Sequence, residues 1–487
     1  MIFALIGAPL AAGLFAFLIR RDVFRRWMLV GAAVFHFVLV AACWVRRPTS
    51  VLDGWLGMDA AGLIVLSLAS VLFLAASGYA LGYLRREAKG PQPDVFEEGS
   101  IFVNEPEAVF TGCLLFFLAA MTGVTLCRHM GLFWVMMEAT TLATAPLICF
   151  HRQHRSLEAT WKYLLICSVG IALALAGNFC LAVSAAAGDG DSSTLVLESL
   201  LRRGPAMNVF WLKAAFLLFL VGYGTKMGLA PMHTWLPDAH SEAPSTVSAL
   251  LSGGLLNCAF LGLWRAEQII HAAGQAPFSD GLFRLFGLLS LATADVFLLG
   301  QTDFKRMLAY SSVEHMGIIS LGIGLGGAGA FGSFFHAVNH SLVKAGLFLT
   351  AGNLLHAFHT KTTSEVRGAL SVRTFSGVLW LAGFVAILGL PPFGPFLSEI
   401  AVLKAAFDGG RWAVSAAFLA ILALIFVGMS RAFLGMAQGR PPETIEKQKE
   451  EWSSVLPPLA LLLAALWMGL FPPDFLMRMI REASGTL

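Results

Sequence analysis

The chain has 487 residues, of which 57% are hydrophobic and only 13% are charged, and its formal net charge is +3. This composition excludes a soluble enzyme with an ordinary polar surface and indicates a polytopic membrane protein. The cations are scattered over short loops and form no basic face, which excludes nucleic acid as a partner. The seven cysteines stand singly, with no Cys/His cluster. We therefore expect no iron–sulfur, haem or zinc centre and no other bound cofactor.

Fourteen apolar runs are long enough to cross a bilayer. They lie at about 1–19, 27–45, 60–84, 107–127, 130–150, 157–187, 208–236, 244–270, 280–301, 307–326, 328–357, 372–405, 411–436 and 452–472. The first run lacks the basic start of a signal peptide and continues into further helices, so we interpret it as a membrane span. The sequence predicts an all-α fold of about fourteen transmembrane helices.

Prolines interrupt two of these runs. Ala230-Pro231 breaks the seventh helix, and Pro391-Pro392 breaks the twelfth. The breaks lie five helices apart, and an odd number of spans per unit inverts the second unit against the first. The predicted domains are three N-terminal helices (1–106), a first five-helix unit (107–270), a second, inverted five-helix unit (271–436), and an inner loop with the last helix (437–487).

The distribution of Lys and Arg between the loops predicts the orientation. The loops after odd-numbered helices hold eighteen cations, including Lys89 and Lys305, whereas those after even-numbered helices and the C-terminal tail hold ten, including Arg265. Because positively charged loops stay in the cytoplasm, both termini are predicted on the outer, periplasmic side of the cell inner membrane.

The remaining five cations lie inside apolar runs, and all are lysines. They are Lys162, Lys213, Lys226, Lys344 and Lys404. Burial favours the release of a proton from lysine, whereas arginine stays charged in nearly any site, so this bias suits proton transfer. Lys226 lies about fifteen residues, or roughly 22 Å, into its helix and is too deep to reach the interface. Lys213 and Lys404 lie near helix ends, where an extended side chain reaches water.

Acids and histidines accompany these lysines. The membrane acids are Glu138, Asp295, Glu314 and Glu399. His336, His340 and Lys344 are spaced four residues apart on one helical face, and we expect His340 and Lys344 to belong to a proton relay. For His336 and Asp295, the pattern leaves open either a relay or a packed, hydrogen-bonded side chain.

Several motifs resemble one family. GYGTKMGLAPMHTWLPDAHSEAPSTVSALLSG, QTDFKRMLAYSSVEHMG, HSLVKAGLFLTAGN and GLPPFGPFLSE are similar to the antiporter-like proton-translocating subunits of respiratory complex I, Mrp cation/proton antiporters and group-4 hydrogenases. The resemblance covers roughly helices four to thirteen. Within the family, MEATTLATAPL, RSLEATWKYLL and SVEHMG look most like the hydrogenase-4 component F type of formate-hydrogenlyase-like complexes.

The resemblance implies a proton path through buried side chains. Its members would be Glu138, Lys162, Lys226, His315, His340, Lys344 and Glu399, with His233, Asn257, Glu314 and His336 as further candidates. Glu138 would pair with Lys226, and Glu399 would be the terminal exchange group. Many members carry a lysine in helix eight where this sequence has Asn257, which cannot be protonated at useful pH.

The sequence therefore predicts a proton-translocating subunit without a redox centre of its own. Its partners would be other membrane subunits and a peripheral, hydrogenase-like redox arm, so whether the chain counts as an enzyme depends on the complex. One alternative is a self-contained cation/proton antiporter of the Mrp type, but Na⁺ needs several oxygen ligands and the membrane acids are too scattered for one cage. Another is a membrane anchor with a degraded proton path, which Asn257 favours.

Overall fold

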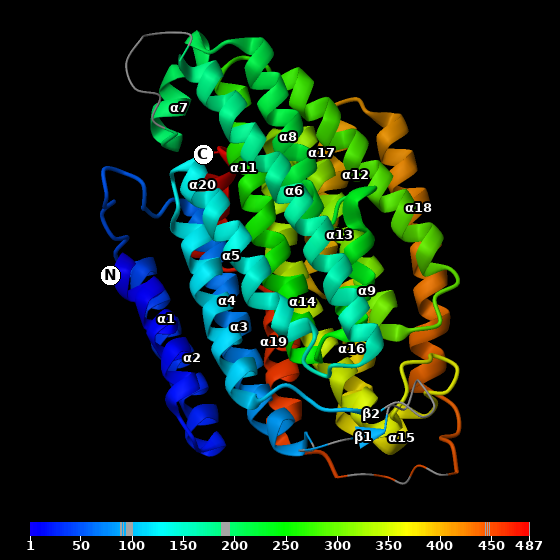
Figure 1. Cartoon of the computed structure of the whole chain (residues 1–487). Coiled ribbons are helices and arrows are strands. Elements are labelled where there is room, and N and C mark those ends of the chain that lie inside the picture. The colour runs from blue at the N-terminus through cyan, green and yellow to red at the C-terminus, as the bar shows by residue number, and fades with distance from the viewer. Residues whose placement is uncertain are drawn as a thin grey trace.

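The computed structural model describes residues 1–87, 90, 92–93, 101–186, 195–443, 445, 447 and 449–486. Its long helices pack side by side in one bundle, with α1 and α2 at one edge and α18 at the opposite edge (Figure 1). Lys89, which entered the count of loop cations, lies outside the described residues.

The first half of the chain forms α1 (Ile2–Leu18), α2 (Asp22–Val45), α3 (Ala60–Arg86), β1 (Gln92–Pro93), β2 (Ile101–Phe102), α4 (Glu107–Leu126), α5 (Met130–Ile148), α6 (His154–Ala186), α7 (Leu197–Arg203), η1 (Gly204–Ala206), α8 (Val209–Met227), η2 (Met232–Thr234), α9 (Trp235–Glu242), α10 (Ser245–Leu250) and η3 (Leu251–Leu255). The second half forms α11 (Leu256–Ala272), α12 (Ala276–Leu298), α13 (Phe304–Leu325), α14 (Gly327–Phe358), α15 (Ala369–Val372), α16 (Thr374–Ile387), α17 (Gly394–Asp408), α18 (Trp412–Ala437), α19 (Trp452–Leu470) and α20 (Asp474–Ser484). The strands β1 and β2 pair antiparallel, η1 and η2 are 3₁₀ turns, and η3 is a π-helical segment.

Each predicted span corresponds to a helix or to a pair of helices, so the all-α membrane fold is confirmed. The seventh span is divided into α8 and α9, and the twelfth into α16 and α17, as the prolines predicted. By length and apolar composition alone, ten helical segments of the described chain could cross a membrane. The long helices α13 and α14 are not among them, because buried polar residues reduce their apolar character. The division into two inverted units stays a prediction.

Loops that are far apart in sequence meet at each end of the bundle. At the end that carries α7, Leu56 is bridged to Cys127, and His129 to Val196. α20 is held at the same end because Arg47, in the loop after α2, pairs with Glu482 at 2.5 Å. The opposite end carries β1, β2 and α15 (Figure 1). We call these the α7 end and the α15 end, and both chain termini lie at the α7 end.

The assignment of Arg265 to a loop was wrong. This arginine lies inside α11 with 1% of its surface exposed. Its guanidinium lies over the ring of Phe133, 5.2 Å from the centroid, and one nitrogen is 3.9 Å from a carboxylate oxygen of Asp59. A cation–π contact and a nearby carboxylate stabilise a charge that burial would otherwise disfavour. The apolar runs therefore do contain an arginine.

Two glycines set the spacing between α12 and α13. A Cβ atom added at Gly287 would lie 2.7 Å from the backbone N of Leu321 and 2.9 Å from the carbonyl O of Gly317. A Cβ added at Gly317 would in turn lie 2.9 Å from the carbonyl O of Gly287. Small residues at such positions let membrane helices approach closely enough for their backbones to touch.

Gly287→Ala should therefore destabilise the bundle by about 1–3 kcal/mol, because the added methyl group meets backbone atoms that cannot move independently. Gly281→Ala on the same helix is the matched control, since its Cβ would meet only the end of Arg284, at 3.9 Å. The measurement is the thermal unfolding midpoint of each purified variant in detergent. Equal midpoints for the two variants would contradict this account of α12–α13 packing.

Candidate functional site

Lys226 lies in the last turn of α8 and is completely buried. Its ammonium donates a hydrogen bond to the hydroxyl of Tyr163 at 3.2 Å and lies 5.1 Å from the centroid of that ring. Glu138, on α5, accepts hydrogen bonds from Ser168 at 3.0 Å and from Thr141 at 3.1 Å. We call Glu138, Tyr163, Ser168 and Lys226 the first polar cluster. It joins α5, α6 and α8 across the interior of the bundle.

The predicted direct pair of Glu138 and Lys226 is not formed in the structure. No ion pair joins the two side chains, and each is bound by a neutral hydroxyl group of α6 instead. Ser168 is thus the α6 partner of the Glu138 carboxylate, and Tyr163 is the α6 partner of the Lys226 ammonium.

The break after Lys226 is stabilised by one side chain from α9, which follows the break, and by one from α12. Gly228 adopts a left-handed conformation, with φ of 81°, and ends α8. The indole of Trp235 then donates to the carbonyl O of Thr225 at 2.8 Å, and the amide of Ala230 donates to the hydroxyl of Ser290 at 2.9 Å. These bonds satisfy backbone groups that lose their helical partners, as a break inside a membrane requires.

Two of the sequence candidates near this break lie apart from the first polar cluster. Lys162 was expected among buried groups, but 46% of its side chain is exposed, and it pairs with Glu158 at 2.7 Å and Asp238 at 3.0 Å. It lines a cavity of about 410 Å³ at the α15 end. His233, on η2, is 6% exposed and packs against the rings of Phe297 and Tyr310.

The second half of the bundle contains a larger group of buried polar residues. We call Glu314, His315, His336, His340, Lys344 and Glu399 the second polar cluster; they come from α13, α14 and α17.

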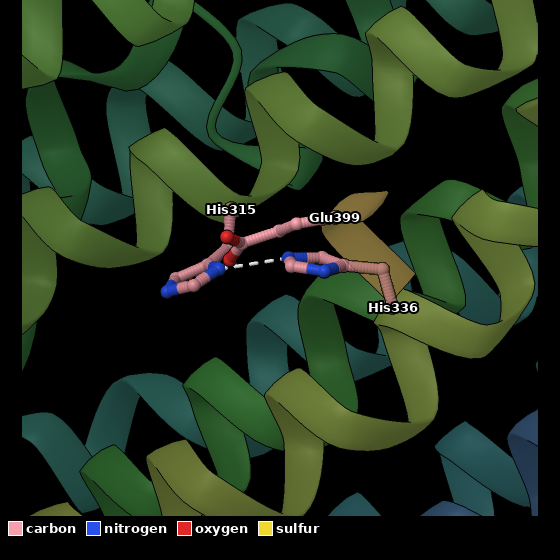
Figure 2. A group of neighbouring side chains, drawn as sticks. All are labelled: His315, His336 and Glu399. Atoms are coloured by element: carbon pink, nitrogen blue, oxygen red, sulfur yellow. Dashed lines mark hydrogen bonds between the residues drawn. The ribbon is translucent and has the colours of Figure 1, made fainter. Parts of the chain in front are cut away.

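Direct contacts link three members of the second polar cluster (Figure 2). Nδ1 of His315 lies 2.8 Å from Nε2 of His336, and the other nitrogen of His336 lies 2.9 Å from the hydroxyl of Ser398. The carboxylate of Glu399 lies beside His315, and one donor atom from each of Glu399, His315 and His336 lies within 4.8 Å of the other two. Two imidazoles and a carboxylate could also hold a transition metal, but here the histidines form a hydrogen-bonded chain suited to proton transfer.

His340 and Lys344 extend this chain along α14. The rings of His315 and His340 have centroids 5.2 Å apart. The Lys344 ammonium donates to the carbonyl O of Leu308 at 2.7 Å. Within the described part of the chain, neither nitrogen of His340 finds a hydrogen-bond partner, and neither does Oε2 of Glu314. Buried polar atoms of this kind are positions for internal water, which would complete a proton path.

Glu399 contacts the break in the twelfth span. α16 ends at Ile387, and Gly389 adopts a φ of 60° before α17 begins. A Cβ atom added at Gly389 would collide with the Glu399 carboxylate, and one at Gly394 would collide with the side chain of Asn339. Glycine therefore lets the carboxylate lie directly against the open backbone.

Asn257 contacts α14, the helix that carries His340. It follows the π-helical segment η3, and its amide nitrogen donates to the carbonyl O of Gly253 at 2.7 Å and to the hydroxyl of Ser341 at 2.6 Å. Ser341 follows His340 directly in α14. Asn257 thus joins α11 to α14 through neutral groups. The sequence analysis did not predict η3, although the neighbouring glycines of Ser252-Gly253-Gly254 favour such an irregularity.

Lys305 is a buried cation that the sequence analysis wrongly placed in a loop. Its ammonium donates to the carbonyl oxygens of Ser241 at 3.1 Å and Ala243 at 2.5 Å. It lines a cavity of about 340 Å³ at the α15 end together with His151, whose pKa falls to about 3 because burial and the nearby Lys305 and Lys361 disfavour its charged form.

The sequence did contain a signal that Lys305 lies in a helix and not in a loop. Asp303 accepts hydrogen bonds from the backbone amides of Lys305 and Arg306, so it is the N-cap of α13. An aspartate just before an apolar periodic run is a helix-start signal, and it places Lys305 inside the helix. His240, next to this region, was also missed: it is fully buried and stacks on Phe348, with ring centroids 5.1 Å apart.

The remaining membrane lysines lie near the surface of the bundle. The side chain of Lys404 is 70% exposed and pairs with Asp408, and Lys213 lies over the ring of Phe278, 5.1 Å from its centroid. Asp295, whose role the sequence left open, is 8% exposed on α12, and its Oδ1 has no hydrogen-bond partner in the described chain.

Removal of the Tyr163 hydroxyl tests its role as the partner of Lys226. Tyr163→Phe should destabilise the protein by at least about 1.5–3 kcal/mol, the usual range for a hydrogen bond to a charged group, because it also removes the bond between this hydroxyl and that of Thr144 at 2.6 Å. Tyr310→Phe is the control, because Tyr310 is half-buried and stacks on Phe297 without a described hydrogen bond from its hydroxyl. Thermal unfolding of the two purified variants is the measurement. A Tyr163→Phe variant as stable as the Tyr310→Phe variant would show that this bond contributes little.

Comparison with known proteins gives a family match over most of the bundle. A family described as NADH:quinone oxidoreductase/Mrp antiporter, TM matches residues 127–425. A "Hydrogenase-4 component F homolog" of Methylacidiphilum infernorum (isolate V4) is 39% identical over 296 residues, which are 60% of this chain and 62% of that relative. "Hydrogenase-4 component B" of Escherichia coli (strain K12) is 28% identical over 449 residues, which are 86% of this chain and 62% of that protein.

The matched regions thus span less than two thirds of both relatives. Among solved structures, a chain of the Mrp complex from Dietzia sp. DQ12-45-1b superposes with a TM-score of 0.85 at 18% identity, covering 100% of this chain and 97% of that chain. At that identity, the likeness shows a shared fold.

Proposed function

Because the chain belongs to the NADH:quinone oxidoreductase/Mrp antiporter family of transmembrane proteins, we propose that it is a proton-translocating subunit of a larger, redox-driven membrane complex of the hydrogenase-4 type. The observation that carries the proposal is the second polar cluster, in which the imidazoles of His315 and His336 and the carboxylate of Glu399 lie close together inside an apolar bundle. Ionisable groups buried at membrane depth mark ion pathways and proton relays.

The proposed path runs through both polar clusters. Lys226 belongs to the first cluster, and Asn257, which is bonded to Ser341 next to His340 in the sequence, would provide a neutral connection to the second cluster. Glu399 is the terminal exchange group, because it lies against the opened backbone of the twelfth span. Asn257 can carry a proton only by way of hydrogen-bonded water, so charge would move in two separate steps, one in each cluster.

At the α15 end, the path would begin at Lys305. This buried ammonium lines the cavity of about 340 Å³, and the carbonyl groups of Ser241 and Ala243 hold it near the C-terminus of α9. The negative end of a helix dipole stabilises a cation in this position. His240 is close to Ser241 in sequence and is fully buried, so it supplies the next titratable group toward the interior.

We propose that electron transfer takes place in partner subunits, as the printed names of the relatives suggest for their own complexes. A conformational or charge change in a partner would then alter the hydrogen bonds of one cluster and move its proton. The partners would be further membrane subunits and a peripheral hydrogenase-like arm.

The alternative is a self-contained cation/proton antiporter, which the family description also names. Na⁺ requires several oxygen ligands at one point. Glu138 lies in the first cluster and Glu399 in the second, where its described neighbours are imidazoles. This separation favours proton over Na⁺ translocation. Na⁺ transport by the purified chain in liposomes, without a redox partner, would support the antiporter instead.

Two substitutions at Glu399 test the proposed exchange role. Glu399→Gln keeps the shape and removes the ionisable group, so redox-driven acidification of vesicles should be abolished, whereas Glu399→Asp keeps the carboxylate on a shorter stem and should retain part of the activity. Both rates are normalised to assembled complex on a native gel. If Glu399 only caps local donors, the Gln variant will be fully active and the Asp variant impaired, which would remove Glu399 from the path.

The orientation follows from the cation count and is proposed for the whole bundle: the α15 end faces the cytoplasm, and both termini face the periplasm. A reporter that is active only outside the inner membrane, fused after Leu487, should therefore give a signal. The same reporter inserted between Gly439 and Arg440, at the α15 end, is the control and should be silent. The reverse pattern in stably produced fusions would overturn the orientation.

A further inference from the structure

We propose that Glu267, His271 and Asp280 form a divalent metal site, suited to Zn²⁺, at the α7 end of the bundle. Glu267 and His271 lie four residues apart on α11, and Asp280 lies near the start of α12, across the turn at 273–275. One donor atom from each residue lies within 4.8 Å of the other two. None of the three belongs to the proposed proton path, so this site does not depend on the proposed function.

The two carboxylates converge on one imidazole nitrogen. Nε2 of His271 lies 2.7 Å from Oε1 of Glu267 and 3.3 Å from Oδ1 of Asp280. In a tetrahedral Zn²⁺ site with bonds of about 2.0–2.1 Å, ligand atoms are roughly 3.3–3.4 Å apart. Small side-chain rotations therefore bring the three atoms to coordinating positions. A single proton on Nε2 can bond well to one carboxylate, whereas a divalent cation attracts both.

Glu267 provides the second observation. Its side chain is only 2% exposed, and neither of its oxygens receives a hydrogen bond of regular geometry from the described residues. A buried carboxylate without such bonds is costly unless a cation accompanies it. Arg284 is the next cation along α12, but it donates to the carbonyl O of Gly324. Among described lysines and arginines, none forms an ion pair with Glu267 or Asp280. The cation beside both carboxylates is the protonated imidazole of His271, and a divalent metal ion would take the place of its Nε2 proton.

Access and ligand type favour Zn²⁺ from the aqueous side. The side chain of His271 is 40% exposed and that of Asp280 is 21% exposed, which leaves an entry path and room for water as a fourth ligand. Mg²⁺ and Ca²⁺ prefer all-oxygen sites, whereas imidazole suits Zn²⁺. A bound ion would tie α11 to α12, the helices on either side of the predicted junction between the two five-helix units.

The test uses the full-length chain, purified in detergent, freed of its affinity tag and treated with a chelator. Zn²⁺ binding is then measured by competition with a chromophoric chelator. Wild type should bind one Zn²⁺. His271→Ala and Asp280→Asn should each weaken the Zn²⁺ affinity by at least about 100-fold, because even residues that only orient a metal ligand alter affinity by 10–100-fold. Asp280→Asn preserves the shape of a partly exposed side chain, so it reports on binding if His271→Ala fails to fold.

His154→Ala removes an exposed histidine at the α15 end and is the matched control, which should keep wild-type affinity. The comparison also separates this site from the buried histidines of the second polar cluster, since any ion held there would remain in the His271→Ala variant. Equal Zn²⁺ affinity in wild type and both site variants would overturn the proposal. Displacement of Zn²⁺ by an equal concentration of Mg²⁺ would overturn the assignment of an imidazole-bound metal.

Discussion

The two ammonium groups of the polar clusters, those of Lys226 and Lys344, are buried without an ion pair to any described carboxylate. Lys226 is held by the hydroxyl of Tyr163, and Lys344 by the carbonyl of Leu308. Neutral groups bind a cation less strongly than a carboxylate does, so the charge state of each lysine responds to changes in its surroundings. The rest of the bundle is arranged around this constraint, because an apolar environment otherwise disfavours both charges.

The breaks in the seventh and twelfth spans also provide polar groups for buried charges. A continuous helix satisfies its own backbone and offers few polar groups to a buried charge, whereas a broken one opens carbonyl and amide groups that must find partners. Trp235 and Ser290 satisfy the first break with side-chain hydrogen bonds. At the second break, Gly389 leaves room for the carboxylate of Glu399. Each polar cluster thus lies next to irregular backbone.

Much of this architecture could be predicted from the sequence. Long apolar runs gave the spans, and Pro231 and Pro391 marked the breaks, because both signals are local properties of the chain. The residues of the second polar cluster were all among the candidates. The spacing of His336, His340 and Lys344 on one helical face is also local, whereas His315 and Glu399 were implied by the resemblance to the family.

The contacts between distant helices could not be predicted. Nothing near Lys226 in the sequence shows that Tyr163 would be its partner, because that contact depends on the rotation of α6 against α8. The same rotation carries Lys162, one residue earlier, to the surface. Arg265 and Lys305 were misplaced because charge alone was used to assign them to loops, whereas Phe133 and the carbonyl groups at the end of α9 stabilise them inside the bundle. Tertiary partners decided these positions.

The central claim is that Lys226 carries a proton rather than only a positive charge, and one substitution separates the two roles. Lys226→Arg keeps the charge but cannot release a proton at useful pH. The measurement is redox-driven acidification of inverted vesicles, normalised to assembled complex, with Lys213→Arg on the same helix as the control because arginine can keep its contact with the Phe278 ring. The account predicts that Lys226→Arg loses proton translocation while Lys213→Arg retains it. Wild-type acidification by the assembled Lys226→Arg variant would contradict the account.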